Sequence, residues 1–512
     1  MSQGAQYVAE LLGGRFDVHA VAGTDTGLPP AFELGGDTAE LAARKVELDQ
    51  IRARFADDPQ QVLDQFRGFF HDSELTADDL QQFVATWDFA VTQPDAFADA
   101  IESGQPSFGL GDWFNRVRGY LHAPKDVSAG DAALIAELRD KYRVPAEIAI
   151  NPSIRQFETY DPGWVPLLTA SVTEKRGGWP DLQKFRSHEA SASNFIYPSD
   201  LDYGATGIKI GLLSDFGTGY YHSQAIARQL EAWAYPYLFH LGDVYYAGRP
   251  DEFASRFKAP LANLVKRTKL LGLAENHELY SGGKSYLQYF DELHHAGLTP
   301  QEGSYFCVPF QHHQVIGIDV NWHGRQTFTD PKCRDWLRDV IAGSAGRTNL
   351  LLTGSAPFGY PSKDRNPLLA DLWQFVRDGK IQFWAWGDDH YCAVFGRHPQ
   401  LAPFIGACIG HGGFPGERQA ADQPCWTTPL WVEDEPRFPA WTQFHQDAGN
   451  NGWCEATLTA DGGLELLFVD WLAAKRHRIR LTRNGDALQP AAVEIFGGRG
   501  DRTAAPVLHR PA

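Results

Sequence analysis

The segments IKIGLLSD (208–215), YLFHLGD (237–243) and TKLLGLAENHE (268–278) decide how this chain folds. In each of them a short apolar run ends at acidic or amide residues. Apolar runs of this kind, stopped by Gly, Asp or Asn, are typical of buried strands in a parallel sheet. Ligand sites in open α/β sheets lie beyond the carboxyl ends of such strands. Carboxylate and amide oxygens at that edge suit a di- or trivalent cation, so the sequence predicts a metal centre.

Strand–helix alternation continues on the C-terminal side of these segments. We expect strands at 208–214, 237–242, 268–274, 314–320, 349–353 and 381–387, and helices near 221–233, 251–266, 285–296, 331–342 and 366–378. Alternation at this spacing predicts βαβ units. Two alternating runs on either side of Ala460–Gly463 predict a hairpin over residues 453–471.

Residues 1–150 have the apolar periodicity of helices. Asp37 can cap one helix, Thr76 and Asp79 form a capping-box-like start for a second, and a third is expected over 132–142. These helices carry no chemical motif, so we interpret them as a helical extension that covers the sheet or forms a subunit interface. Residues 151–206, rich in Pro, Gly, Ser and Asp, are expected to be an irregular connection to the core.

Composition limits the classes of function. The 512 residues allow two to four domains at roughly 100–200 residues each. The net charge of −18, from 46 basic and 64 acidic residues, argues against a nucleic-acid or acidic-membrane partner. A phosphorylated substrate stays compatible with this charge, because bound metal reverses the local potential.

Targeting and cysteine patterns favour a cytoplasmic protein. No apolar run approaches the ~18 residues that span a bilayer, and the N-terminal residues lack the basic and apolar regions of a signal peptide. The six cysteines contain no C-x-x-C pair, which favours reduced, mostly buried thiols.

Five short motifs follow one another in a fixed order. They are Asp215-Phe216-Gly217, Gly242-Asp243-Val244-Tyr245-Tyr246, Glu275-Asn276-His277-Glu278, Leu351-Leu352-Thr353-Gly354 and Gly387-Asp388-Asp389-His390. This order resembles the calcineurin-like metallophosphoesterases and, among them, the purple acid phosphatase pattern D-x-G, G-D-x-x-Y, G-N-H-D/E, V-x-x-H, G-H-x-H. One such motif carries little information, whereas five in order at strand ends are specific, although two of them are altered.

The resemblance implies an α/β fold with a metallophosphoesterase core of two sheets, a β-sandwich flanked by helices. It covers residues 207–400, and residues 401–512 are expected to close the core with β-rich structure. It assigns nothing to residues 1–150.

The resemblance also implies a first metal ion held by Asp215, Tyr246 and His390, with Asp243 shared with a second ion. A carboxylate, phenolate and imidazole set favours Fe(III). Tyr245 stands beside Tyr246, and only one of the two can point at the metal. Tyr246 occupies the motif position, so we assign the ligand to it. The alternative is a core tyrosine with a satisfied hydroxyl.

The second metal site departs from the family pattern. It should hold Asp243, Asn276 and two histidines, but Gly354 and Asp388 stand at the histidine positions. Asp388 can still bind, and a carboxylate shifts the preference from Zn toward Mg or Mn. Three residues near this gap are interpreted as supporting or surface residues rather than ligands: Glu275 (glycine in the family), Asp389 and His411.

The function that the resemblance implies is a metal-dependent phosphoesterase. It would hydrolyse a phosphomonoester or phosphodiester through a metal-bound hydroxide, with one or two metal ions as cofactors. His277 would bind the phosphoryl group or protonate the leaving oxygen, or else hold Asn276. The expected partner is a phosphorylated small molecule or other phosphoester substrate, with no membrane and no nucleic acid. A second copy or a protein partner could bind through the N-terminal helices.

The two absent histidines leave an alternative open. A catalytically impaired member of the family would keep the fold and act as a scaffold or partner-binding module.

Overall fold

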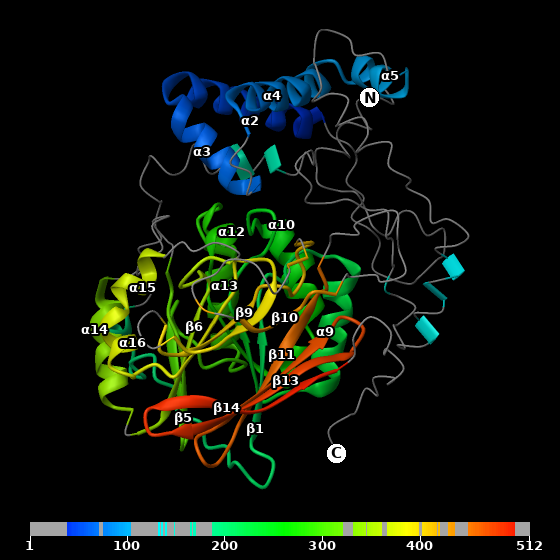
Figure 1. Ribbon diagram of the computed structural model, residues 1–512. Coiled ribbons are helices and arrows are strands. Elements are labelled where there is room, and N and C mark those ends of the chain that lie inside the picture. The colour runs from blue at the N-terminus through cyan, green and yellow to red at the C-terminus, as the bar shows by residue number, and fades with distance from the viewer. Residues whose placement is uncertain are drawn as a thin grey trace. The chain divides into compact units, whose positions relative to one another are not determined.

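A computed structural model provides the structure of the chain (Figure 1). It describes residues 38–70, 75–103, 187–320, 331–344, 346–360, 366–398, 402–416, 429–435 and 449–496, with a few isolated residues between them. The chain divides into two compact units. One contains Met1–Glu137 and Ala146–Asp181, and the other contains Leu138–Pro145 and Leu182–Ala512.

Helices form the described part of the first unit: α2 (Thr38–Asp57), α3 (Pro59–Phe70), α4 (Ala77–Thr92) and α5 (Pro94–Ser103). The expected capping box is confirmed, because Asp79 N donates to Thr76 Oγ1 (3.2 Å) and Thr76 N donates to Asp79 Oδ2 (2.8 Å). Phe66 and Phe83 pack with ring centroids 5.5 Å apart. Of the helix expected over 132–142, the structure describes residues 132, 133, 135, 136, 139 and 140, and all six are helical.

Two seven-stranded sheets form the core of the second unit, and they confirm the predicted α/β fold. The first sheet has the order β14-β13-β12-β11-β1-β2-β3, and its strands are β1 (Ile208–Leu213), β2 (Tyr237–His240), β3 (Lys269–Gly272), β11 (Gly452–Leu458), β12 (Leu464–Asp470), β13 (Lys475–Asn484) and β14 (Ala487–Ile495). The second has the order β10-β8-β9-β7-β6-β5-β4, and its strands are β4 (Phe306–Pro309), β5 (His313–Gly317), β6 (Thr348–Thr353), β7 (Phe383–Trp386), β8 (Cys392–Phe395), β9 (Ile405–Ile409) and β10 (Pro429–Val432).

Each sheet has a parallel part that determines where a site can form. Strands β1, β2 and β3 pair in parallel, and so do β5, β6, β7 and β9. The six expected strands are all present within a few residues of their predicted ends. The expected hairpin is β11–β12, which pairs antiparallel. The loops that follow β1, β2, β3, β6 and β7 therefore leave carboxyl ends of parallel strands, where sites in α/β sheets form.

Helices cover the outer faces of the two sheets (Figure 1). Helix α9 (Tyr221–Trp233) lies against the first sheet, where Gln229 Nε2 donates to Asp470 O (3.2 Å). Helix α14 (Pro331–Ala342) lies on the second, with Trp336 packed on Tyr305 at 4.9 Å between ring centroids. Helix α13 (Lys284–His295) follows β3.

Two expected helices are interrupted. The segment 251–266 forms α10 (Pro250–Phe253), η3 (Ala254–Lys258), α11 (Ala259–Leu261) and η4 (Leu264–Lys266). Pro260 has no N–H to donate to the carbonyl of Arg256, which accounts for the irregular turn there. The segment 366–378 divides into α15 (Pro367–Asp371) and α16 (Trp373–Arg377).

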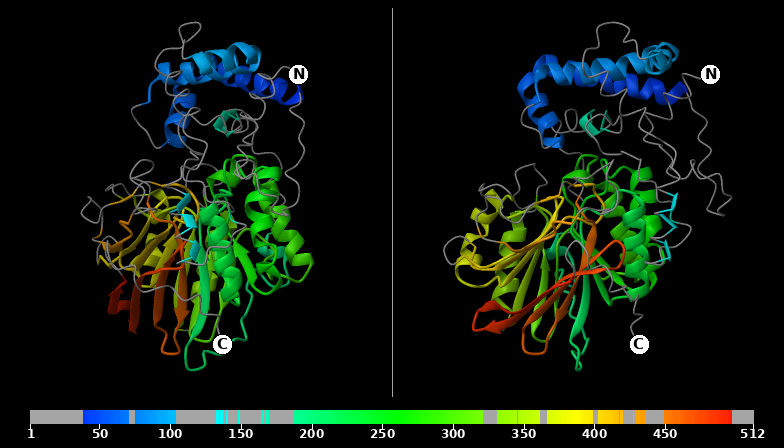
Figure 2. Two further views of the ribbon diagram at one scale, coloured as in Figure 1. Left: turned by 90° about the vertical axis from the view of Figure 1, so that its right-hand side faces the viewer. Right: turned by 45° about the vertical axis from the view of Figure 1, so that its right-hand side comes forward.

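The two sheets lie one against the other (Figure 2), and a single hydrophobic core lies between them. A continuous cluster of buried side chains includes Leu212 and Phe239 from the first sheet and Phe306, Leu351 and Trp384 from the second. The rings of Phe239 and Phe306 stack at 5.7 Å across the interface. Face-to-face packing of this kind holds the strand ends of both sheets in a fixed relation, so the loops that leave them can build one site.

The described cysteines are buried and free: Cys307, Cys333, Cys392, Cys408 and Cys454. This agrees with the expectation of unpaired thiols, and Cys425 lies outside the described residues. None of the described helices is long and apolar enough to cross a membrane. The cytoplasmic location stays a prediction.

Candidate metal centre

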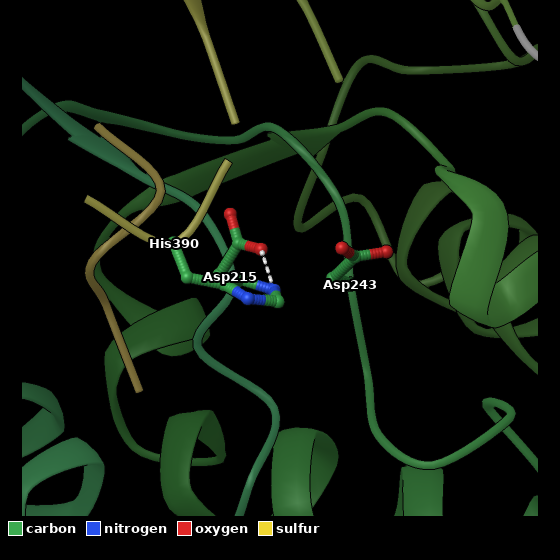
Figure 3. Close-up of side chains that lie close together, drawn as sticks. All are labelled: Asp215, Asp243 and His390. Carbon is green, nitrogen blue, oxygen red and sulfur yellow. Dashed lines mark ion pairs between the residues drawn. The ribbon is translucent and has the colours of Figure 1, made fainter. Parts of the chain in front are cut away.

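Three of the predicted ligands meet at the carboxyl ends of parallel strands (Figure 3). Asp215 follows β1, Asp243 follows β2 and His390 follows β7. One ligand atom from each lies within 4.8 Å of the other two, and His390 Nε2 is 3.4 Å from Asp215 Oδ1. Both carboxylates are buried, with exposed fractions of 0% and 1%. A carboxylate–carboxylate–imidazole set of this size can hold a metal ion.

Backbone pairing beyond the strand ends fixes the two aspartates. Asp215 N donates to Gly242 O (2.9 Å), and Gly217 N donates to Asp243 O (3.2 Å). Tyr245 N then donates to Gly217 O (3.0 Å). The loops after β1 and β2 therefore run side by side as an extension of the sheet, which places both carboxylates without help from a ligand.

Three acidic residues of the centre have left-handed backbone conformations. The φ angles are 56° for Asp215, 75° for Asp243 and 63° for Asp388. Aspartate tolerates this region better than most residues, but it still costs about 1–3 kcal/mol where the surrounding structure imposes it. Strain of this kind gathers at functional sites, because the side chain must point in one direction.

The hydroxyl of Tyr245 lies between the three ligands. It donates to Asp215 Oδ1 (2.7 Å), and it is 3.2 Å from Asp243 Oδ2 and 2.9 Å from His390 Nε2. Burial and the charges of Asp215 and Asp243 raise the pKa of this phenol well above its usual value. A bound cation would reverse the sign of the local potential and favour the phenolate.

Tyr246, the tyrosine that we predicted as a ligand, has different neighbours. Its ring lies 5.1 Å from the guanidinium of Arg256, and its backbone carbonyl accepts a hydrogen bond from His277 Nδ1. The structure thus brings Tyr245 to the centre, where the motif spacing favoured Tyr246. Ligation by Tyr246 stays a prediction. The contacts of the Tyr245 hydroxyl favour Tyr245 instead.

His277 lies on the rim of the centre. Its backbone N donates to Asp243 Oδ1 (3.3 Å), and its ring centroid is 4.2 Å from that of Tyr245. Because Nδ1–H donates to Tyr246 O, the neutral ring carries only a lone pair on Nε2. His277 can therefore donate a proton from Nε2 only as the imidazolium, and as the neutral ring it can only accept one there.

The predicted ligands of the second metal ion flank the trio. Asn276 begins the short helix α12 (Asn276–Leu279), and its Oδ1 is buried without a hydrogen-bond partner. Asp388 N donates to Asp215 Oδ2 (3.1 Å). Burial and the charge of Asp215 raise the pKa of the Asp388 carboxyl to about 6. A buried amide oxygen and a destabilised carboxylate are donors that a cation would satisfy.

Electrostatics distinguish the two buried aspartates. For Asp215 burial alone would raise the pKa, but the hydrogen bond and charge of His390 hold it below its usual value. For Asp243 burial raises the pKa far above the usual value, and neighbouring carboxylates add to the rise: Asp215, Glu278, Asp388 and Glu275. A cation bound to Asp243 would relieve this repulsion, so the donor set fits a metal ion.

Glu278 has a structural role that the sequence did not indicate. Its Oε2 accepts from Asp243 N (3.1 Å) and from Glu275 N (2.9 Å), and burial raises its pKa to about 8. It thereby ties the loops after β2 and β3 together. The motif contained this residue, but only the backbone of the folded chain reveals which N–H groups it holds.

Asp389 and His411, which the sequence placed near the absent histidines of the second site, have structural surroundings of their own. Asp389 Oδ2 accepts from the Tyr391 hydroxyl (3.3 Å), and burial raises the pKa of Asp389 well above its usual value. His411 is buried, and burial lowers its pKa to about 4. Neither belongs to the trio of ligand atoms, and Glu275 and Asp388 also lie outside it.

Residues 208–392 match the family model of the calcineurin-like phosphoesterases. This part of the chain thus resembles a calcineurin-like phosphoesterase domain, in agreement with the order of the motifs. A comparison with curated proteins found no match.

Similar solved structures include a purple acid phosphatase, PPD1, from seeds of yellow lupin (Lupinus luteus), which is 14% identical with a TM-score of 0.39; the match covers 53% of this chain and 52% of that one. PhoD is 11% identical with a TM-score of 0.41, covering 57% and 73%. GAP50, the anchor in the inner membrane complex of Plasmodium, is 9% identical with a TM-score of 0.39, covering 56% and 88%. The match spans about half the length of the lupin protein, and no activity can be transferred at these similarities.

Proposed function

We propose that this chain is a metal-dependent phosphoesterase that hydrolyses a phosphomonoester or phosphodiester at the centre formed by Asp215, Asp243 and His390. One observation carries the proposal: two buried carboxylates and the partly exposed imidazole of His390 meet at strand ends within the segment that matches the calcineurin-like phosphoesterases. When bound, the metal would activate water and neutralise the charge of the phosphoryl group.

The residues of the chain divide into two sets of donors. Asp215, His390 and a tyrosine would hold the first ion, for which Fe(III) is the favoured metal. The contacts of Tyr245 support it as that tyrosine. Asn276 and Asp388 would hold a second ion, Mn, Mg or Zn, with Asp243 shared between the two sites.

His277 would act on the substrate rather than on the metal. Its Nδ1–H is engaged with the carbonyl of Tyr246, which fixes the plane of the ring. As the imidazolium, it would hydrogen-bond a phosphoryl oxygen through Nε2 and pass that proton to the leaving oxygen. As the neutral ring it could do neither, so this role predicts loss of activity when the imidazolium titrates.

The proposal is tested by steady-state hydrolysis with the full-length protein. Wild-type chain purified without chelators is assayed on an aryl phosphate monoester and on a bis-aryl phosphate diester, with Asp243→Asn as the control. The proposal requires hydrolysis by the wild type and its loss in the variant. Equal rates for the two proteins would overturn it, because no metal-dependent path could survive loss of the shared ligand.

A second candidate function rests on the altered motifs. Gly354 and Asp388 stand where the family pattern has histidines, so the chain could keep the fold as a scaffold or partner-binding module. A well-folded wild type that takes up no metal and hydrolyses neither ester would favour that reading. The substrate, the cytoplasmic location and a partner at the N-terminal helices remain predictions under either function.

A further inference from the structure

Gly354 follows β6 at the place where the resemblance puts a histidine of the second metal site. A Cβ atom at this residue would lie 2.0 Å from Glu275 Oε2 and 2.7 Å from Glu275 Cδ. Non-bonded heavy atoms do not approach so closely in a packed interior. The carboxylate of Glu275 therefore occupies the space into which a side chain at residue 354 would project.

The position of Glu275 is fixed on several sides. The residue is fully buried, and its Oε1 accepts from Ser355 Oγ (2.8 Å). Its backbone N donates to Glu278 Oε2 (2.9 Å). A Cβ atom at Gly242 would fall 2.6 Å from Glu275 Cβ, so Gly242 leaves room for this side chain. The carboxylate is thus held in place by the ends of three strands.

The neighbours of Glu275 are the donors assigned to the second ion. Asn276 is adjacent in the chain, with its buried Oδ1 that has no hydrogen-bond partner. Glu278 Oε2 accepts from both Asp243 N (3.1 Å) and Glu275 N (2.9 Å), so the backbones of Glu275 and Asp243 lie close together. Burying several charged carboxylates together is strongly unfavourable unless a cation compensates them or protonation removes their charge.

We propose that Glu275 replaces the absent histidine as a ligand of the second metal ion, in a site completed by Asp243, Asn276 and Asp388. The exchange is reciprocal: a ligand is lost at the end of β6 and gained at the end of β3, and each change makes room for the other. An all-oxygen site of this kind suits Mn²⁺ or Mg²⁺ and gives up the imidazole that favours Zn²⁺. The inference deepens the proposed function and rests on it only for the location of the centre.

The competing explanation is that Glu275 merely fills space and accepts from Ser355. Glutamine has the same shape and keeps that acceptor, so Glu275→Gln separates ligation from packing. The matched control is Asp389→Asn, which changes a half-buried carboxyl of the same rim that we do not place at the metal. Metal-free full-length proteins are titrated with Mn²⁺ and with Zn²⁺ by calorimetry, and circular dichroism checks that each variant is folded.

The wild type is expected to take up two Mn²⁺ per chain. Glu275→Gln is expected to weaken the second Mn²⁺ at least about tenfold and leave the first unchanged, whereas Asp389→Asn leaves both unchanged. Gly354→His alone would collide with Glu275. The double exchange Glu275→Gly with Gly354→His should restore a second ion and raise the affinity for Zn²⁺ relative to Mn²⁺ at least about tenfold, because imidazole replaces a carboxylate.

Three results would overturn the inference. They are a Glu275→Gln variant that titrates like the wild type, an Asp389→Asn variant that is weakened as much, and a wild type that takes up fewer than two Mn²⁺. Hydrolysis measured on the same samples separates this inference from the proposed function. Wild type that binds two Mn²⁺ without hydrolysing either ester would contradict the activity alone, and an active enzyme with an unaffected Glu275→Gln titration would contradict the ligand alone.

Discussion

The proposed centre has two halves, which would share Asp243 and which the fold builds in different ways. The Asp215 half consists of Asp215, Tyr245 and His390, and the Glu275 half consists of Glu275, Asn276 and Asp388. In the first half the three side chains contact one another, so the geometry is complete without a metal ion. In the second, an amide oxygen has no hydrogen-bond partner and burial disfavours the charge of a carboxylate. A preorganised half should bind its ion more tightly than one that needs the ion to balance its charge.

The substitution with the largest expected effect removes the residue that the two halves share. Asp243→Asn should lower hydrolysis by more than about a hundredfold and reduce the content of both metals. Without metal the same substitution should leave the melting temperature unchanged or raise it, because it removes one of several repelling carboxylates. Assays of hydrolysis, metal content and thermal unfolding check the three statements. A variant that keeps both ions would remove the basis for a shared ligand.

Substitutions confined to one half should each affect the binding of a different metal ion. Asp215→Asn removes a residue that holds Tyr245 and His390, so we expect loss of the tighter ion and at least about a hundredfold loss of hydrolysis. Asp388→Asn should weaken only the second ion, by about tenfold. Titration of each variant with Mn²⁺ distinguishes them. Equal effects on both ions would mean that the centre is one coupled site.

The tyrosine of the first half can be identified by its spectrum. With Fe(III) bound, a tyrosinate ligand gives a visible charge-transfer band. Tyr245→Phe should abolish the band because its hydroxyl lies among the three ligands, and Tyr246→Phe should keep it. The reverse outcome would restore the assignment that the motif spacing favoured.

The close packing of Gly354 against Glu275 in the second half can be tested by unfolding the protein without metal. Gly354→Ala should lower the free energy of unfolding by about 1–3 kcal/mol, because its Cβ would meet the Glu275 carboxylate at 2.0 Å. Gly343→Ala is the matched control, since its Cβ would have no neighbour closer than 3.4 Å. Denaturant unfolding measures both. Addition of Glu275→Gly should recover most of the loss, and a double variant no more stable than Gly354→Ala would show that the collision lies elsewhere.

Protonation of buried histidines outside the centre should have a smaller effect, and this effect acts on the stability of the whole fold. Burial lowers the pKa of His313 and of His477 to about 4. His313 Nε2 donates to Gly463 O (2.7 Å), and its Nδ1 accepts from the Tyr203 hydroxyl (2.8 Å), so the neutral ring is satisfied. Below pH 6.5 the unfolded chain binds protons at these histidines, and the native chain does not until about pH 4.

Stability should therefore fall as the pH falls through that window, by on the order of 1 kcal/mol per histidine between pH 6.5 and 5. Urea unfolding of the metal-free protein at several pH values measures the loss. His313→Gln, which cannot titrate, should show a smaller dependence on pH than the wild type. An identical dependence would remove His313 as a cause.

The strands that build the centre could be predicted because each is an apolar run that stops at a polar residue. Strands β13 and β14 were missed, since their charged residues hide the alternation: in β13, the buried Ile479 and Leu481 lie on either side of the exposed Arg480. Strand β4 was not predicted either, because it is short and ends at Pro309.

Asp215 and His390, which meet in the first half, were both named from the sequence, whereas the ligand tyrosine stays a prediction, with Tyr245 in contact where the spacing favoured Tyr246. Sequence spacing gives the type and order of the ligands, but a turn of the backbone decides which of two adjacent tyrosines points inward. The relation between Glu275 and Gly354 could not be predicted, because the two residues are far apart in the chain and meet only where β3 and β6 end. The sequence has Gly354 where the family pattern has a histidine, and the structure shows that the Glu275 carboxylate occupies that space.

Anomalous diffraction from crystals of the wild-type protein soaked in Mn²⁺ tests the central claim most directly. We expect two peaks on either side of the Asp243 carboxylate, about 3.5–4 Å apart as in two-metal sites. One should lie within bonding distance of Asp215 and His390, and the other within bonding distance of Glu275. Crystals with no peak among Asp215, Asp243 and His390 would contradict the claim that this core is a metal centre.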